Sequence, residues 1–275
     1  MRKKLIVAVV AIVFFALFGR LIFESVKLLP VFLELFTKRE IALKKTDERV
    51  NILILGIGGE RHEGPLLTDT IIYAAVDPTK ERTTLISLPR DLWMPDLRAK
   101  INTAYAYGEG KQNGGGIILA RAIVKKILGQ PVDYVVRVDF GGFIKAIDLL
   151  GGIDVKVERD FDDLEYPIAG KETDTCGYTG EEFEKRATAS SQLEAFPCRY
   201  QQVSFNKGLS HMDGEEALQY VRSRHAKGSE GTDIARSKRQ EKVIAAFKEK
   251  VFSTETILNP VKLLNLYDTF QASID

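Results

Sequence analysis

Arginines in the C-terminal part of the chain have the type and spacing to bind phosphate. Arg222 and Arg224 lie two positions apart, so their guanidinium groups share a side where the chain is extended. Gly228 and Gly231 follow and indicate a loop beside them. A guanidinium presents a planar fork of donors that matches phosphate oxygens. We therefore expect this loop to carry two phosphate-binding side chains.

The helix predicted directly after this loop can add a third arginine. Asp233, Arg236 and Gln240 are spaced i, i+3 and i+7, so they lie on one helical face. Between Arg222 and Lys242 there are seven Lys or Arg residues against three acids. A mixed, solvated surface is the usual explanation for a charged helix. A phosphate-binding site is favoured instead, because two loop arginines and one on a facing helix can enclose several phosphate oxygens.

Two shorter motifs add candidate residues near the ends of predicted strands. Arg90 and Asp91 follow the strand 83–88, and ligands of open α/β sheets bind beyond the carboxyl ends of strands. Asp69, before the strand 70–76, offers a carboxylate that suits magnesium together with phosphate oxygens. The plainer interpretations are a surface ion pair at 90–91 and a turn aspartate at 69. The residues alone leave both interpretations open.

Other kinds of site have no support in the sequence. His62, His211 and His225 are isolated, and their spacing forms neither a metal site nor a Ser-His-Asp triad. The glycines after position 56 miss the third position of a dinucleotide-binding fingerprint. The net charge of +1, with 28% charged residues, indicates neither a nucleic-acid-binding tail nor disorder.

Short apolar strands and amphipathic helices must position the candidate residues. Strands are predicted at 51–56, 70–76, 83–88, 132–138 and 153–157, and helices at 115–128, 140–150, 213–221 and 232–251. Asp213 and Glu216 have the spacing of a capping box at the start of the third of these helices. This order predicts an α/β domain whose central sheet is mixed or mostly parallel and lies between helical layers.

Residues 160–204 have no sustained periodicity and are interpreted as an irregular insertion. Cys176 and Cys198 lie in this stretch, 22 positions apart. Two cysteines alone make no zinc site, so they form either a disulfide or two free thiols. Outside the cytoplasm the disulfide is favoured, and closing this loop would stabilise the fold by about 3 kcal/mol.

The N-terminus has the pattern of an uncleaved membrane anchor. Residues 1–4 form a basic flank, and residues 5–23 are an apolar run of nineteen in which Arg20 is near the end. A spanning helix needs roughly 20 residues, and an arginine near its end can snorkel to the interface. The flank is expected to stay in the cytoplasm, which places a linker at 24–49 and the domain 50–275 outside. A signal peptide has the same charge layout, but no small-x-small cleavage site follows.

Six short motifs occur in the order and approximate spacing of a known family. They are Asn-Ile-Leu-Ile-Leu-Gly at 51–56, Leu-Thr-Asp-Thr-Ile at 67–71, Ser-Leu-Pro-Arg-Asp at 87–91, Lys-Ile-Asn-Thr-Ala-Tyr at 100–105, Tyr-Val-Arg-Ser-Arg at 220–224, and Asp-Ile-Ala-Arg-Ser-Lys-Arg-Gln at 233–240. Together they resemble the LytR–CpsA–Psr family over about residues 50–252. The resemblance implies an αβα sandwich that binds a polyprenyl pyrophosphate, uses Mg²⁺ and transfers a teichoic acid, a capsular polysaccharide or a related glycopolymer to peptidoglycan.

By matching position, the resemblance also implies roles for individual residues. Asp69 would bind the metal, and the pyrophosphate would be held by Arg90, Arg222, Arg224, Arg236 and Gln240. Arg90 and Asp91 would be the catalytic pair, with Asp91 orienting or deprotonating the acceptor hydroxyl. The supporting residues would be Asn102, Asp233 and Arg239. Residues 117–128 and 143–150 are candidates for lining an apolar channel for the carrier, although most of them also suit ordinary core packing.

Two positions depart from the family pattern. Gly58 and Gly59 stand where an aspartate is usual, and Leu67 stands where an arginine is usual. Glu60, His62 or Glu63 would have to compensate, or the metal site is weakened. Besides a membrane-bound phosphotransferase, the sequence therefore allows a non-catalytic binder of lipid-linked polymer. A transcriptional regulator is the third alternative, but no helix-turn-helix pattern occurs, and an outward-facing domain cannot contact DNA.

Overall fold

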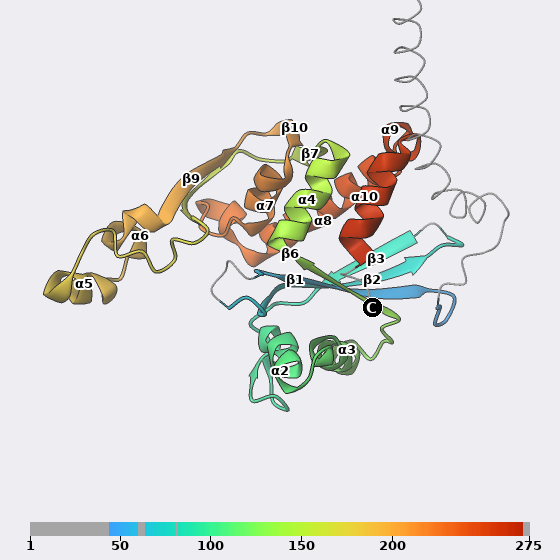
Figure 1. Cartoon of the computed structure of the whole chain (residues 1–275), viewed down its shortest axis with the longest axis horizontal. Helices are drawn as coiled ribbons and strands as arrows, with labels where there is room; N and C mark the ends of the chain where they lie inside the picture. The colour runs from blue at the N-terminus through green and yellow to red at the C-terminus, as the bar shows by residue number, and fades with distance from the viewer. Residues whose placement is uncertain (1–43, 60–63, 81, 272–275) are drawn as a thin grey trace, which may run out of the picture.

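The computed structural model describes residues 44–271 except 60–63 and 81 (Figure 1). The expected basic flank at 1–4, the expected anchor at 5–23 and most of the expected linker lie outside the described residues. Within the described part of the chain, no helix combines the length and the apolar character that crossing a membrane requires.

A four-stranded sheet in the order β3-β2-β1-β6 forms the centre of the fold. Its strands are β1 (Val50–Ile57), β2 (Thr68–Asp77), β3 (Arg82–Ser87) and β6 (Tyr134–Asp139). β1 pairs in parallel with β6, whereas β1 with β2 and β2 with β3 are antiparallel. The prediction of a mixed sheet is confirmed, and the option of a mostly parallel sheet is wrong. The turn at Asp77 and Pro78 joins β2 to β3 as a hairpin, which forces antiparallel pairing.

Helices cover both faces of this sheet, as Figure 1 shows. One face packs against α2 (Ala104–Lys111) and α3 (Gly115–Leu128). The other face carries α4 (Phe140–Leu150), α7 (Gly214–Arg222), α8 (Asp233–Val251) and α10 (Pro260–Gln271), with the short α9 (Thr254–Ile257) before α10. The predicted helical layers on both sides of a central sheet are therefore confirmed.

Local capping explains where the helices that flank the site begin. Asp139 ends β6 and accepts the backbone N–H of Gly142, which caps α4. The predicted capping box at Asp213 and Glu216 is present at the start of α7. The hydroxyl of Thr232 accepts the backbone N–H of Ala235 and caps α8. Each cap satisfies backbone donors that have no partner within the helix.

Smaller elements surround the two layers. The ribbon of β4 (Trp93–Met94) and β5 (Ala99–Lys100) leads into the 3₁₀ turn η1 (Ile101–Thr103). β7 (Ile153–Val157) pairs with β10 (Gly208–Met212), and β8 (Phe161–Pro167) pairs with β9 (Tyr200–Phe205). The loop between α7 and α8 contains the 3₁₀ turn η3 (Gly228–Gly231).

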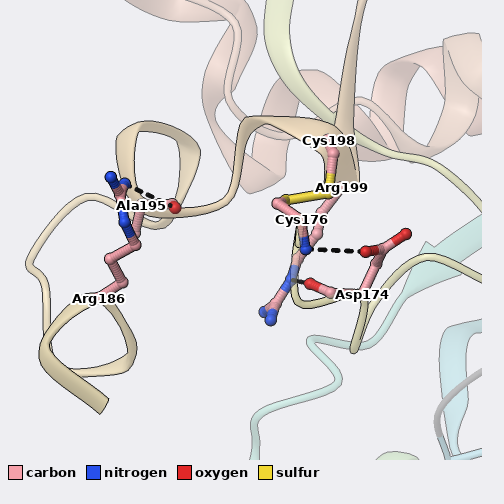
Figure 2. Close-up of a disulfide and its surroundings, with 6 residues drawn as sticks. All are labelled: Asp174, Cys176, Arg186, Ala195, Cys198 and Arg199. Atoms are coloured by element: carbon pink, nitrogen blue, oxygen red, sulfur yellow. Dashed lines mark hydrogen bonds between the residues drawn. A yellow bond between two sulfur atoms is a disulfide. The ribbon is translucent and has the colours of Figure 1, made fainter. Parts of the chain in front are cut away.

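The stretch interpreted as an irregular insertion is an ordered arm. β8 and β9 form its two-stranded base, and α5 (Gly180–Ala187), α6 (Gln192–Ala195) and η2 (Pro197–Arg199) lie between them. The interpretation of 160–204 as irregular is therefore wrong. These elements are short and pair with each other, so the sequence shows no sustained periodicity. Cys176 and Cys198 are joined at an S–S distance of 1.98 Å (Figure 2), which confirms the disulfide.

Candidate functional site

A cavity of about 530 Å³ lies between the central sheet and the helices α4, α7 and α8. Side chains alternate across a strand, and β1 uses both of its faces. Leu53 and Leu55 pack into the core beneath α2 and α3, whereas Ile52 and Ile54 line the cavity. Further apolar lining comes from Ile72, Val136, Val138, Phe143, Ala146, Ile147, Leu218, Val221, Val243, Ile244 and Phe247. The unbroken apolar sequence of β1 thus serves a core on one face and a cavity on the other.

The two helical segments that were expected to line an apolar channel behave differently. Phe143, Ala146 and Ile147 of α4 do line the cavity. The segment 117–128 belongs to α3, which packs on the opposite face of the sheet. Most of its apolar residues pack in the core there, and none lines the cavity, so the expectation for this segment is wrong.

Charged residues from separate parts of the chain meet at one end of the cavity. The predicted residues that line it are Asp69, Arg90, Arg222, Arg224, Arg236 and Gln240. Gly56 and Asp139, near the carboxyl ends of the parallel strands β1 and β6, also line it. Ligands of α/β sheets bind beyond such strand ends. The charged mouth therefore adjoins an apolar space, as an amphipathic ligand requires.

Arg90 lies between two carboxylates at this mouth. Its Nη1 donates to Asp69, and its Nε is 3.6 Å from Oδ2 of Asp91. This Nε is buried and has no hydrogen-bond partner among the described residues. A buried donor without a partner is destabilising, so a phosphate oxygen placed here would gain a hydrogen bond that the protein does not supply.

Asp91 lies at the rim rather than in the cavity. Lys100 donates to it at 2.6 Å, and this hydrogen bond, opposed by partial burial, lowers the pKa of Asp91 together with the charges of Lys100 and Arg90. Asp91 is thus ionised at neutral pH, which suits it to orient a hydroxyl. Asn102 lies behind Arg90, and its backbone N–H donates to the Arg90 carbonyl at 3.2 Å.

Arg222 enters the cavity from the last turn of α7. Its guanidinium lies 4.2 Å from the centre of the Phe140 ring, and its Nη1 donates to the hydroxyl of Tyr166 at 3.3 Å. Burial raises the pKa of Tyr166 to about 12, so this partner stays neutral. The chain was expected to be extended from Arg222 to Arg224, but it leaves the helix only at Ser223.

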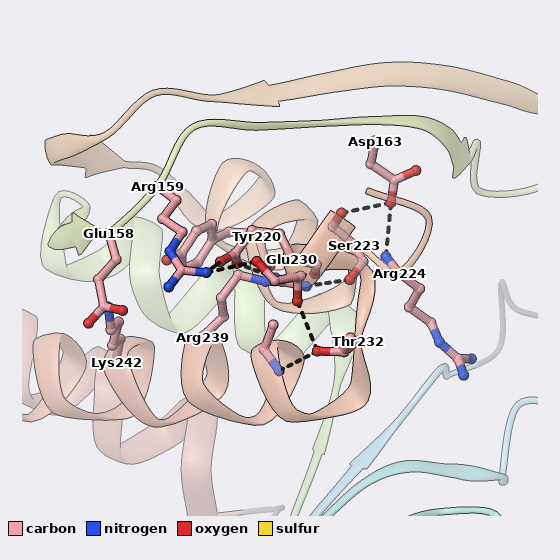
Figure 3. Close-up of polar contacts among 12 residues, drawn as sticks. Glu158, Arg159, Asp163, Tyr220, Ser223, Arg224, Glu230, Thr232, Arg239 and Lys242 are labelled. Carbon is pink, nitrogen blue, oxygen red and sulfur yellow. Dashed lines mark hydrogen bonds and ion pairs between the residues drawn. The ribbon is translucent and has the colours of Figure 1, made fainter. Parts of the chain in front are cut away.

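Asp163 fixes the backbone that carries Arg224, and sequence reasoning missed it. One of its oxygens accepts from the hydroxyl of Ser223 at 2.7 Å and from the backbone N–H groups of Arg224 and His225 at 2.9 and 3.1 Å. Burial raises the pKa of this carboxyl, but the hydrogen bonds outweigh it and lower the pKa. Figure 3 shows the Arg224 guanidinium pointing away from Asp163. Asp163 belongs to the stretch interpreted as irregular, so no pattern indicated its role.

Arg236 reaches the cavity from the first turn of α8, beside the other cavity arginines. It pairs with Asp233 at 3.0 Å, and Arg224 lies 4.0 Å from the same carboxylate. Burial lowers the pKa of Arg236, and the charges of Arg224 and Arg90 lower it further. Mutual repulsion of this kind makes a bound anion favourable. Gln240, about one turn further along the same face of α8, donates to the hydroxyl of Thr70 at 3.1 Å.

Arg239 does not line the cavity. Its side chain instead bonds to the loop that carries the cavity arginines. Its Nε donates to the Tyr220 carbonyl at 2.8 Å, and its Nη2 donates to the Ser223 carbonyl at 2.5 Å. Its Nη1 donates to the carbonyl of Glu230 at 2.8 Å and to its carboxylate at 3.2 Å (Figure 3). The side chain is buried. Arg239 thus joins the end of α7, the η3 turn and α8.

The position where an aspartate is usual adjoins another carboxylate. A side chain at Gly59 would place its Cβ 3.2 Å from Cβ of Asp139, which itself lines the cavity. Asp139, the last residue of β6, pairs with Ile57 of β1. Asp69 lies in β2, which pairs with β1 on its other side. Glu60, His62 and Glu63, which were expected to compensate, lie outside the described residues. The described structure thus offers Asp69 and Asp139 as carboxylate donors.

Comparisons with known proteins agree with this arrangement. TagV of Bacillus subtilis, named a polyisoprenyl-teichoic acid–peptidoglycan teichoic acid transferase, is 30% identical over 214 residues, which cover 75% of this chain and 45% of TagV. TagU of the same organism, with the same transferase name, is 29% identical over 216 residues, which cover 77% of this chain and 55% of TagU. The chain spans about half the length of the curated relatives it matches.

Solved structures show the same fold. The crystal structure of B. subtilis TagV matches with a TM-score of 0.54 and 26% identity, covering 84% of this chain and 74% of that one. The crystal structure of B. subtilis TagU matches with a TM-score of 0.52 and 26% identity, covering 83% and 76%. The family model described as the LytR_cpsA_psr family matches residues 34–275. Because that match includes nearly the whole chain, the protein belongs to the LytR–CpsA–Psr family.

Proposed function

We propose that this protein transfers a phosphate-linked glycopolymer from a polyprenyl-pyrophosphate carrier to peptidoglycan. One observation carries the proposal: guanidinium groups at the mouth of the cavity adjoin an apolar space between sheet and helices. A polyprenyl pyrophosphate has the matching shape, with a doubly charged head and a hydrocarbon tail. The transferase names of TagV and TagU support the same reaction.

The reaction is a displacement at phosphorus. A hydroxyl oxygen of the acceptor attacks the phosphorus that bears the polymer, and a new P–O bond forms. The bond from this phosphorus to the bridging oxygen breaks, and the carrier leaves as its monophosphate. The hydroxyl proton passes to solvent. Negative charge develops on the oxygens around the attacked phosphorus, and Arg90, Arg224 and Arg236 stabilise it by fixed hydrogen bonds.

The remaining polar residues position the two substrates. Asp91 accepts a hydrogen bond from the acceptor hydroxyl and directs its oxygen toward phosphorus. Arg222 is held by its aromatic partners, so it binds the head group without having to be ordered first. The apolar residues of β1, β6, α4 and α8 exclude water from the tail, and this fixes which phosphate faces the rim.

Magnesium is part of the proposal. The carboxylates of Asp69 and Asp139 at the mouth fit a hard cation, which takes few protein oxygens and completes its shell with phosphate and water. These two residues would hold the ion, and the ion would neutralise charge on the diphosphate. A single-pass anchor at 5–23, with the N-terminus in the cytoplasm and the domain outside the cell membrane, would bring the site to its lipid substrate.

A reconstituted assay tests the proposal. The full chain in detergent micelles is incubated with a polyprenyl-pyrophosphate-linked sugar, Mg²⁺ and a peptidoglycan fragment. We expect carrier monophosphate to appear together with sugar joined to the fragment. Arg224→Ala should lower the rate by roughly a hundredfold or more, the usual effect of removing one such charge-stabilising group. Arg159→Ala, a change at an exposed arginine away from this cavity, is the matched control and should leave the rate unchanged.

Three outcomes would contradict transfer. Monophosphate released without joined sugar means hydrolysis of the carrier. Binding without release means a non-catalytic binder, which the glycines at 58–59 would explain. An unchanged rate in Arg224→Ala would move the chemistry away from this cavity.

A further inference from the structure

Trp93 is the only tryptophan of the chain, and it is 60% exposed. It lies in β4, three residues after Arg90. Arg90 and Asp91 form a turn before this strand, and the backbone N–H of Leu92 closes it by donating to the Pro89 carbonyl at 3.1 Å.

The hydrogen bonds of the ribbon hold Trp93 beside the residues that face the acceptor. The backbone N–H groups of Asn102 and Ile101 donate to the carbonyls of Arg90 and Leu92, at 3.2 and 2.8 Å. Trp93 then pairs with Lys100 across the ribbon. Trp93–Met94 and Ala99–Lys100 are therefore the two strands of a short ribbon, and backbone hydrogen bonds tie this ribbon to the turn that carries Arg90 and Asp91.

Lys100 links the indole to Asp91. Side chains directly opposite each other in an antiparallel ribbon lie on the same face, so Trp93 and Lys100 share one face. Nζ of Lys100 donates to Asp91 at 2.6 Å, which brings this carboxylate to the same place. One surface thus combines an aromatic ring, an ammonium group and a carboxylate.

We propose that Trp93 is a stacking platform for a sugar ring of the peptidoglycan acceptor, with Lys100 bonding a hydroxyl of that ring. This inference rests on the proposed function and names the acceptor side of the same site. A pyranose presents a face of C–H groups that packs on an indole, while its rim of hydroxyls needs polar partners. The platform holds one sugar of a glycan strand, while the next sugar presents its hydroxyl to Asp91 and to phosphorus.

The position of the ring also explains why so large an apolar group stays in water. An exposed indole gains nothing for the fold, and tryptophan is favoured where a partner covers its ring and its N–H keeps a polar contact. Phe252, at the end of α8, is similarly exposed at 68% but belongs to another element and does not line the cavity. It therefore provides a matched control.

Fluorescence of the single tryptophan gives a direct test in the full chain. Titration with β-1,4-linked N-acetylglucosamine–N-acetylmuramic acid tetrasaccharide should quench or blue-shift the emission and saturate. Vesicles of anionic phospholipid without glycan should leave the emission unchanged. No spectral change with the tetrasaccharide would overturn the proposal, and a change with vesicles alone would assign Trp93 to the membrane surface instead.

A kinetic test separates this inference from the proposed function. Trp93→Ala should raise the KM for the tetrasaccharide acceptor about tenfold or more, while the KM for the lipid-linked donor stays unchanged. Trp93→Tyr should recover most of the loss, and Phe252→Ala should behave as wild type. An acceptor KM unaltered in Trp93→Ala, in a chain that transfers normally, would overturn the stacking role alone. Absence of transfer in the wild type would instead overturn the proposed function.

Discussion

The carboxylate of Asp163 accepts the backbone N–H of Arg224 at 2.9 Å, so a buried anion from the arm sets the position of a cavity arginine. The same oxygen also bonds Ser223 and His225. Asp163→Ala would leave these donors buried and unpaired. We expect the free energy of unfolding to fall by about 3 kcal/mol, measured by urea denaturation, and the donor KM to rise. Asp162→Ala, at the exposed neighbour, should change neither quantity.

The same carboxylate predicts a pH dependence of stability. Its pKa is lower in the folded chain than in the unfolded chain, so it stabilises the fold above the unfolded value of about 4. This contribution is lost as the pH falls through the lower folded pKa. The difference in unfolding free energy between the wild type and Asp163→Asn should be constant from pH 7 to about 5 and shrink below pH 4. A difference that grows on acidification would contradict the assigned direction.

Arg236 should not tolerate lysine. Its guanidinium is largely buried, bonds Asp233 at 3.0 Å and presents further donors to the cavity. Lysine keeps the charge but loses the planar fork, so Arg236→Lys should lower kcat/KM for the donor by about tenfold to a hundredfold. Lys238→Arg, on another face of the same helix, is the matched control for side-chain exchange. Full activity of Arg236→Lys would mean that charge alone suffices here.

Filling the cavity should discriminate between donors by tail length. Val136 on β6 faces the cavity, and Val136→Trp would occupy part of its volume of about 530 Å³. We expect the KM of a long-chain polyprenyl donor to rise at least tenfold, while that of a short-chain, soluble analogue changes little. Ile118→Trp alters an exposed residue of α3 on the other face of the sheet and should affect neither donor. Equal effects on both donors would indicate a general folding defect.

The disulfide should stabilise the arm without acting in the reaction. It closes a loop of 22 residues, and Figure 2 shows Arg199 bonded to Asp174 beside the disulfide. Arg199 donates to the Asp174 carbonyl at 2.7 Å. Replacing both Cys176 and Cys198 with serine should lower stability by about 3 kcal/mol and speed proteolysis within 168–199. Turnover of lipid-linked donor in intact chains should stay within twofold.

The sequence predicted elements best where local rules decide them. α3 and α4 begin and end as their glycines and apolar periods indicate, and the capping box at Asp213 and Glu216 is present as predicted. The arm was missed because its strands are short and pair across more than thirty residues. Pairing over such a separation leaves no periodic pattern in the sequence. The direction of pairing in the sheet was only partly predicted, since the hairpin at Asp77 sets it rather than the alternation of strands and helices.

The positions of the cavity arginines could be predicted from the sequence, but the contacts that hold these arginines in place could not. Spacing on α8 placed Arg236 and Gln240 on one face, and the structure brings both to the cavity. Asp163 holds Arg224 from 61 positions away, and no local sequence pattern indicates a contact over that separation. Arg239 was predicted as a supporting residue, but three of its acceptors are backbone carbonyls, which have no signature in the sequence.

The three-way attachment of Arg239 has a kinetic consequence. Because one side chain fastens Tyr220, Ser223 and Glu230, the segment between α7 and α8 is already set before any ligand arrives. In the proposed reaction, association of the carrier would then involve no ordering of this segment. Exchange of spent for loaded carrier would be limited by lipid diffusion and by extraction of the tail, rather than by the ordering of this segment.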